Sequence, residues 1–268
     1  MTGALFRVAL AFALTLPAAA HAVRSDWAAA DAAKMRVLLA GPSDDSIVGG
    51  IEFALEPGWY TYWRNPGEAG VPPAFDFSGS ENVADVAVLY PTPERYDDGT
   101  SVSLIYRDEV VFPLAVTPAR PGEPVTLSVE AVFGVCSEVC VPTRASAAAT
   151  LPPAAPHDAL SEALLERFLA RVPKPAEPGH FEVESVTVVD EALLIDVRMP
   201  DSAFSDLFAD PPEGWYIGQP EFVSRSDGVS RYRLSLAGSP EDGEVRGQTF
   251  RFVAVAGGEA IEEAIEIR

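Results

Sequence analysis

The segment Thr126-Leu-Ser-Val-Glu-Ala-Val-Phe133 decides the fold class, because its apolar and polar side chains largely alternate. Alternation with a period of two is typical of a β-strand with one buried face. Similar short runs, rich in β-branched and aromatic residues and separated by Gly, Pro, Asp and Ser, cover residues 50–55, 59–63, 83–89, 110–117 and 125–135. No pattern typical of a crossover helix lies between them, which favours an antiparallel β-sandwich over a parallel α/β sheet.

A second β-rich region follows a stretch that prolines interrupt, Pro152-Pro153-Ala-Ala-Pro156. Asp158 is placed to cap a helix over residues 158–172, which we expect to pack within the molecule. Its apolar face comprises Leu160, Leu164, Leu165, Phe168, Leu169 and Val172. After a stiff linker with Pro173, Pro175 and Pro178, strands are predicted at 181–189, 193–199, 215–217, 230–237, 249–256 and 260–267. The pattern predicts two sandwich domains with a helix and a proline-rich linker between them.

The two predicted domains share one short motif, Gly58-Trp59-Tyr60 and Gly214-Trp215-Tyr216. Either the second domain repeats the first or the two tripeptides coincide by chance, because a repeat requires sustained similarity.

Composition excludes several classes of function. The 268 residues include 40 acidic and 19 basic side chains, a formal net charge of -21. Such a charge repels nucleic acid and anionic membrane surfaces. A hydrophobic fraction of 48% is too high for a disordered chain.

Residues 1–22 have the pattern of a secretory signal peptide. Arg7 precedes an apolar run over 8–16, and Ala20-His21-Ala22 suits signal peptidase. The apolar run is too short to span a membrane, and Pro17 ends it. We expect a mature chain of residues 23–268, exported to the periplasm without a membrane span, where disulfides can form.

Reactive chemistry is concentrated at Cys136 and Cys140. On one extended strand, residues four apart lie about 13 Å from each other, whereas a disulfide needs Cα atoms within about 7 Å. The pair must therefore lie on a turn, which Gly134 and Pro142 bracket. We expect an accessible hairpin tip.

Three interpretations of this pair are open. A five-residue loop closed by a disulfide gains only about 2 kcal/mol, which favours thiol–disulfide exchange over a structural bridge in an interaction module. Glu138 disfavours a strongly acidic thiol, and Arg144 is the nearest cation. The third interpretation is copper handling, since thiolates bind Cu(I), although the further soft or imidazole ligands lie far along the chain: Met35, Met199, His157 and His180.

Three motifs in order resemble the N-terminal periplasmic domain of the thiol:disulfide interchange protein DsbD family, which includes ScsB. They are Glu56-Pro57-Gly58-Trp59-Tyr60-Thr61-Tyr62-Trp63, the pair Leu104-Ile105-Tyr106-Arg107-Asp108 and Val110-Val111-Phe112-Pro113-Leu114, and residues 134–142. The resemblance covers about residues 40–151. It implies an immunoglobulin-like sandwich that takes electrons from a membrane partner through a thioredoxin-like domain and reduces periplasmic disulfide proteins, including isomerases and cytochrome c maturation factors.

The resemblance also implies roles for single residues. Cys140 would form the mixed disulfide with partners, and Cys136 would resolve it. A cap loop over residues 93–99, with Glu94 and Asp97 on either side of the shielding ring of Tyr96, would cover the pair. Tyr60 and Tyr62 match aromatic positions near the family's active site, although as strand residues they also suit a β-sandwich core.

The chain departs from the family pattern in three ways. Three residues separate the cysteines in place of five, the cap has no phenylalanine, and neither a transmembrane conduit nor a thioredoxin-like Cys-x-x-Cys follows. A separate membrane thiol-disulfide reductase or thioredoxin-like protein would have to recharge the pair. We expect two immunoglobulin-like sandwiches over 23–152 and 180–268, a connecting segment 153–179, and catalysis without cofactor or metal.

Overall fold

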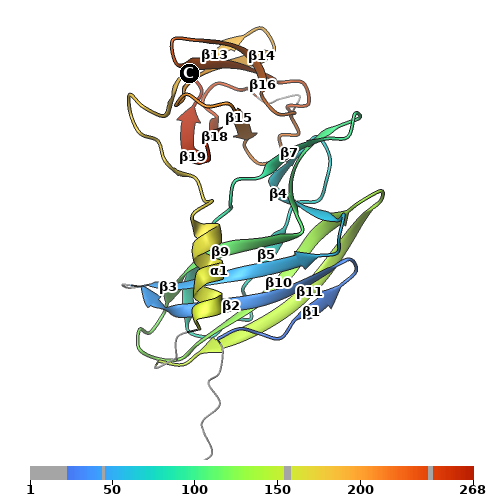
Figure 1. Cartoon of the computed structure of the whole chain (residues 1–268), viewed down its shortest axis with the longest axis vertical. Helices are drawn as coiled ribbons and strands as arrows, with labels where there is room; N and C mark the ends of the chain where they lie inside the picture. Colours follow the sequence, from blue (N-terminus) through green and yellow to red (C-terminus); the bar gives the residue numbers. More distant parts are fainter. Residues whose placement is uncertain (1–22, 44–45, 154–157, 241–243) are drawn as a thin grey trace, which may run out of the picture.

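The computed structural model describes residues 23–43, 46–153, 158–240 and 244–268, so the predicted signal peptide lies outside the described residues. The described chain is all-β except for the helix α1 (Ala159–Leu169). Figure 1 shows two β-sandwiches one above the other, with α1 in front of the strands of the lower one. No helix among these residues has the length and apolar character needed to cross a membrane.

The first sandwich consists of two antiparallel sheets. One sheet has the order β1-β2-β3-β9-β6, with bounds β1 (Ala28–Ala30), β2 (Ala33–Ser43), β3 (Ser46–Leu55), β9 (Glu109–Pro118) and β6 (Val83–Val88). The other has the order β11-β10-β4-β8-β7, with bounds β11 (Cys140–Leu151), β10 (Val125–Cys136), β4 (Tyr60–Gly67), β8 (Val102–Arg107) and β7 (Glu94–Asp97). A short strand, β5 (Ala74–Asp76), pairs with β10.

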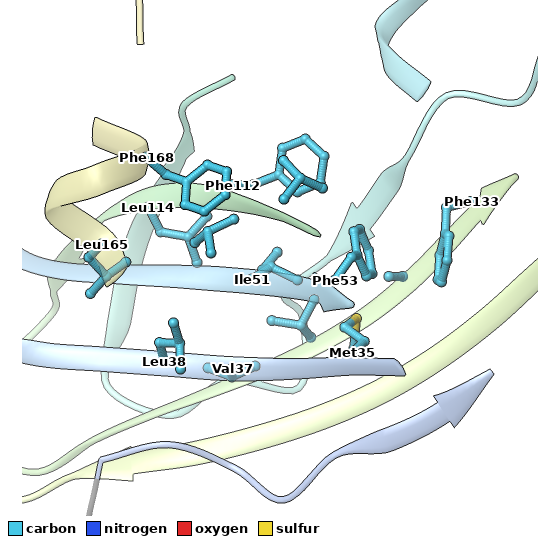
Figure 2. Close-up of a cluster of buried hydrophobic side chains, with 14 of the residues drawn as sticks. Met35, Val37, Leu38, Ile51, Phe53, Phe112, Leu114, Phe133, Leu165 and Phe168 are labelled. Carbon is cyan, nitrogen blue, oxygen red and sulfur yellow. The ribbon is translucent and has the colours of Figure 1, made fainter. Parts of the chain in front are cut away.

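The core of the first sandwich lies between these sheets. In β10, Leu127, Val129, Ala131 and Phe133 are fully buried, as the alternation predicts. Figure 2 shows Phe53 of β3 beside Phe133, and their ring centroids are 4.3 Å apart. Phe53 and Phe133 thus join the two sheets through one aromatic contact.

The helix α1 packs on the first sandwich, as expected for an intramolecular element. Asp158 caps it by accepting hydrogen bonds from the Leu160 amide and the Ser161 hydroxyl. Leu165 and Phe168 are buried in the core, and Figure 2 shows both pointing from α1 toward the strands. The predicted apolar face is wrong at Leu160, which is 72% exposed, because the buried face of the helix runs through Ser161, Leu165 and Phe168.

The second sandwich has two smaller sheets around a separate core. One has the order β12-β19-β18-β15, with bounds β12 (Lys174–Pro175), β19 (Glu259–Glu266), β18 (Thr249–Ala256) and β15 (Ser205–Asp210). The other has the order β13-β14-β17-β16, with bounds β13 (Glu182–Val189), β14 (Ala192–Arg198), β17 (Val229–Ser235) and β16 (Glu221–Ser226). All pairs are antiparallel except β12–β19. The prediction of an all-β, two-sandwich protein is confirmed, whereas the immunoglobulin-like connectivity stays a prediction.

The strand predicted at 215–217 is wrong. Trp215 and Ile217 are buried and Tyr216 is 84% exposed, so the side chains alternate as in a strand, but the backbone pairs with no neighbouring strand. Gly214 has a φ of 83° and the Trp215 amide donates to the Pro212 carbonyl, which makes a turn. Residues 59–63 begin with a similar turn, since Gly58 also has a φ of 83°, yet they continue into β4.

Three further strands differ from the prediction. The strands β15 and β16 lie where none was predicted, on either side of that turn. Part of the predicted cap loop 93–99 is the strand β7, because Glu94–Asp97 pairs with β8. The predicted cap therefore consists of an edge strand that ends in a turn.

Candidate redox site

The disulfide between Cys136 and Cys140 closes the hairpin of β10 and β11. The two residues are the last register pair, with Cα atoms 4.1 Å apart. Residues 137–139 form the exposed tip, in which the Ser137 amide donates to the Val139 carbonyl. The pair thus lies on a hairpin turn, where the spacing argument placed it.

The two cysteines differ in exposure. Cys136 is fully buried, because β4 pairs with β10 at Tyr60 and Cys136. Cys140 begins β11 at the edge of the sheet and is exposed. Cys140 is therefore the more accessible of the two cysteines from solvent.

Tyr62 brings a hydroxyl group to both sulfurs. Its Oη lies 2.8 Å from Cys136 Sγ and 3.3 Å from Cys140 Sγ. Burial of the side chain, and secondarily the neighbouring Tyr60, raise the pKa of Tyr62 well above its ordinary value. The phenol therefore keeps its proton at physiological pH and can donate a hydrogen bond to sulfur.

Three tyrosine rings form a small cluster over the buried cysteine. Tyr60 and Tyr62 belong, with Ile105 and Cys136, to a buried group separate from the main core, and Tyr96 of β7 packs against it. The Tyr60 ring is 5.7 Å from the Tyr62 ring and 5.3 Å from the Tyr96 ring, both in edge-to-face geometry. Burial raises the pKa of Tyr60 as well. The structure thus brings the three predicted tyrosines together at the disulfide.

The predicted acidic residues of the cap lie outside this cluster. The Glu94 carboxylate is 3.6 Å from Arg107 Nε, and the Arg107 guanidinium lies 4.6 Å from the Tyr96 ring centroid. Asp97 accepts the Gly99 amide in the turn that ends β7. Glu94 therefore reaches the site through Arg107, whereas Asp97 shapes the turn.

Glycines leave the space that the Tyr62 ring occupies, a feature that sequence reasoning missed. A Cβ at Gly70, whose φ is 131°, would lie 2.3 Å from the Tyr62 ring. A Cβ at Gly134 would lie 3.0 Å from Val71 and 3.2 Å from the same ring. The hydroxyl of Thr61 donates to the Gly134 carbonyl at 2.8 Å. The sequence contains one signal of this packing, because a glycine inside a strand pattern, as at Gly134, often marks the close approach of another group.

The soft ligands named from the sequence are not gathered at the pair. Met35 is buried in the first core and Met199 in the second, while His180 is exposed in the turn before β13. His157 lies outside the described residues. The part of the chain that the structure describes has no group of three His, Cys, Asp or Glu side chains arranged to hold a metal ion.

Comparisons with known proteins agree with this geometry. An antiparallel sandwich with a disulfide at a hairpin tip, one cysteine exposed and one buried, has the features expected of a thiol–disulfide exchange domain. Residues 24–152 match the family model of the thiol:disulfide interchange protein DsbD, N-terminal, and this part of the chain belongs to that family. The family supports a thiol–disulfide exchange role for the cysteine pair.

The fold of both sandwiches is also found in a solved structure. The crystal structure of the N-terminal periplasmic domain of ScsB from Proteus mirabilis aligns with a TM-score of 0.73 and 24% identity. The alignment covers 92% of this chain and 99% of that one, so the likeness in fold extends over the second sandwich. No curated protein sequence matches the chain.

Proposed function

We propose that this protein relays reducing equivalents in the periplasm, from a membrane thiol-disulfide reductase or a thioredoxin-like protein to periplasmic disulfide proteins. The observation that carries the proposal is the unequal exposure of the two cysteines, with the Tyr62 hydroxyl beside both sulfurs. Cys140 is the exchanging sulfur and Cys136 the resolving one.

The first half of the relay reduces the disulfide. A thiolate of the reductant attacks Cys140 Sγ, the bond to Cys136 Sγ breaks, and the electron pair leaves on the Cys136 sulfur. The Tyr62 hydroxyl, 2.8 Å away, stabilises that thiolate by a hydrogen bond until it takes a proton from solvent. The second thiolate of the reductant attacks the mixed disulfide and releases Cys140. Two electrons and two protons have then entered this chain, and the reductant leaves as a disulfide.

The second half passes the electrons on. The Cys140 thiolate attacks a disulfide of the target protein, and one target sulfur leaves as a thiolate. Cys136, held 4.1 Å from Cys140 between Cα atoms, then attacks the Cys140 sulfur of the mixed disulfide. The target is released with both sulfurs reduced, and the Cys136–Cys140 bond is restored. Isomerases and cytochrome c maturation factors are the targets that we expect.

The tyrosine cluster supplies the shield in this proposal. While β7 is in place, Tyr96 on β7 and Tyr60 on β4 cover the buried sulfur and exclude water from it; solvent reaches the sulfur when β7 moves aside. An edge strand of four residues that pairs only with β8 in its sheet can move aside more readily than a central strand. We therefore assign the cap function to β7 and its turn, with Glu94 and Asp97 at its two ends.

A structural role for the disulfide explains the site less well. Its five-residue loop gives about 2 kcal/mol of stabilisation, whereas the domain already has a large buried core. The site is also at the exposed tip of long, fully paired strands. Copper handling lacks further soft ligands near the pair among the described residues.

Periplasmic location is part of the proposal. It is supported by the signal-like residues 1–22 and by the ScsB domain, which is described as periplasmic. We further propose domains over 23–152 and 180–268, connected by 153–179, with the second domain acting on the first as argued below.

The reduction potential of the pair tests the proposal. The full mature chain is equilibrated in a glutathione or dithiothreitol redox series, and thermal unfolding is followed in parallel. A potential between about -180 and -270 mV with an unchanged fold is expected for an exchange protein. A potential well below about -300 mV, with stability lost on reduction, would overturn the relay. Tight Cu(I) binding by the reduced form, with slow thiol exchange, would favour copper handling instead.

A further inference from the structure

We propose that the second sandwich holds the cap strand β7 over the disulfide, and that Arg95 is the positioning residue through which it does so. The inference rests on the proposed function, because it concerns access to the same cysteine pair. The second sandwich would then set how readily a thiol reaches the Cys136–Cys140 bond.

The first step is the anchoring of Arg95 to the second sandwich. Its guanidinium donates to both carboxylate oxygens of Asp206, at 2.9 and 2.8 Å. It also donates to the carbonyls of Leu207 at 3.0 Å and Pro220 at 3.2 Å. A bidentate pair with two further carbonyl contacts fixes the guanidinium in one orientation.

The residues that bind Arg95 are themselves held in the sheet of the second sandwich. Asp206 and Leu207 belong to β15, which pairs residue by residue with β18 of the second sandwich. Leu207 is fully buried, and Arg95 also lies over the Phe208 ring at 5.6 Å. Figure 1 shows β4 and β7 at the end of the first sandwich that faces the second. The position of Arg95 therefore follows the position of the whole second sandwich.

The third step is the link from Arg95 to the disulfide. Successive side chains of a strand point to opposite faces, so Arg95 and Tyr96 leave β7 in opposite directions. Tyr96 packs against the group of Tyr60, Tyr62 and Cys136. In β7, Arg95 thus binds the second sandwich, while the next residue, Tyr96, covers the buried sulfur.

The fourth step is that β7 needs this support. It is an edge strand of four residues, and two of them, Glu94 and Asp97, are exposed. Short edge strands with few buried contacts open locally at low free energy. When Arg95 is released, β7 and Tyr96 move away from the site more often, and a thiol gains access to the disulfide.

A comparison of reduction rates in the full chain tests the proposal. The oxidised protein is mixed with excess reduced glutathione or dithiothreitol at pH 7, and new thiols are trapped with maleimide and counted by mass. Arg95→Gln and Asp206→Asn each break the anchor, from opposite sides. We expect both to be reduced about tenfold faster than the wild type, since a charge-assisted pair is lost from the closed state alone.

The matched control is Arg231→Gln. Arg231 forms the same kind of bidentate pair, with Asp196 at 2.7 and 2.8 Å, but it joins β17 to β14 within the second sandwich. The disulfide of the Arg231→Gln variant should be reduced at the wild-type rate. Arg95→Lys, which keeps the charge but loses the fork, should give an intermediate rate, and thermal midpoints identify any variant that is globally destabilised.

Two results would overturn the proposal. One is an unchanged rate in folded Arg95→Gln and Asp206→Asn, and the other is an equal acceleration in Arg231→Gln. If Arg95→Gln does not fold, Asp206→Asn tests the same contact. The proposed relay is tested separately. A reduction potential in the range of structural disulfides would reject the exchange function. The comparison of reduction rates would still show whether the second sandwich restrains β7.

Discussion

Two hairpins of this molecule close in different ways. The strands β16 and β17 of the second sandwich meet through Asp227 and Gly228, which have φ values of 53° and 78°. Positive φ at both central residues is the geometry of a two-residue hairpin turn, for which Asp-Gly is a preferred sequence. The strands β10 and β11 of the first sandwich meet through Ser137-Glu138-Val139, with no positive φ, and through the disulfide.

A cross-link is therefore not needed to close a hairpin in this chain. The backbone turn alone closes β16–β17, although its strands have only six and seven residues. The strands β10 and β11 have twelve residues each and an unbroken register. They pair over a greater length than β16 and β17, so they need a cross-link less. The disulfide is better explained by exchange chemistry than by structural support, and four experiments test this difference between the hairpins.

The largest effect is expected when the two cysteines are replaced one at a time. Cys136→Ser leaves the exposed Cys140 as a single thiol, which should form a mixed disulfide with oxidised glutathione. Cys140→Ser leaves the buried Cys136, which should react more slowly by orders of magnitude because the attacking sulfur must reach solvent. Mass spectrometry of timed samples measures both rates. Equal rates would remove the assignment of Cys140 as the exchanging sulfur.

The next largest effect is a slower reduction of the disulfide when the Tyr62 hydroxyl, which lies beside both sulfurs, is removed. Tyr62→Phe should slow reduction by dithiothreitol about tenfold or more, because the departing Cys136 thiolate loses a hydrogen bond. The pH at which Cys136 ionises should rise in the same variant. The control is Tyr232→Phe on β17, which removes a buried hydroxyl that donates to the Met199 sulfur in the second sandwich. An unchanged rate in Tyr62→Phe would limit Tyr62 to packing.

A smaller effect, on stability and not on chemistry, is expected at the turn of β16–β17. Gly228→Ala places a Cβ at a φ of 78° and should lower the free energy of unfolding by about 1–2 kcal/mol. Urea unfolding measures the loss, and the rate of disulfide reduction should stay unchanged. Glu138→Ala, at the exposed tip of β10–β11, should stay within about 0.5 kcal/mol of the wild type. A loss of exchange in Gly228→Ala would contradict the separation of the two hairpins.

The smallest effect is a pH dependence of the free energy of unfolding, which comes from an ion pair on β17, the strand after the Asp227-Gly228 turn. Arg231 on β17 faces Asp196 on β14, and its hydrogen bonds hold the pKa of Asp196 below the ordinary value. A depressed carboxyl pKa stabilises the fold above the unfolded-state pKa, near 3.9, and the contribution disappears as the pH falls through the folded-state value. The urea midpoints of wild type and Asp196→Asn should thus differ slightly at pH 7 and converge at low pH. A difference that persists at low pH would point to packing.

Local patterns predicted much of the fold and the position of the cysteines. The alternation of 126–133 indicated β10, and the four-residue spacing of Cys136 and Cys140 is compatible with a disulfide only at a turn. The same kind of alternation misled at 215–217, where burial alternates but no strand lies beside the backbone. Pairing partners, which a periodic pattern does not contain, decide between the two cases.

The long-range contacts of the site could not be predicted in this way. Arg95 and Asp206 are 111 residues apart, and Arg64 and Asp210 are 146 apart. Both pairs depend on how the second sandwich sits on the first, a property of two finished domains. The unequal burial of the cysteines likewise comes from β4 beside Cys136, which neither spacing nor composition specifies.

The contact between α1 and β3 limits how the molecule can be cut. Leu165 occupies the place where a side chain at residue 50 would lie, since a Cβ at Gly50 would be 2.6 Å from Leu165. A fragment that ends at residue 152, with the family match, would lose the burial of Leu165 and Phe168, worth about 3–6 kcal/mol. Its uncovered apolar face would favour aggregation. A fragment that reaches Arg171, whose carbonyl accepts hydrogen bonds from Thr92, keeps the helix and is the shortest first sandwich that should remain in solution.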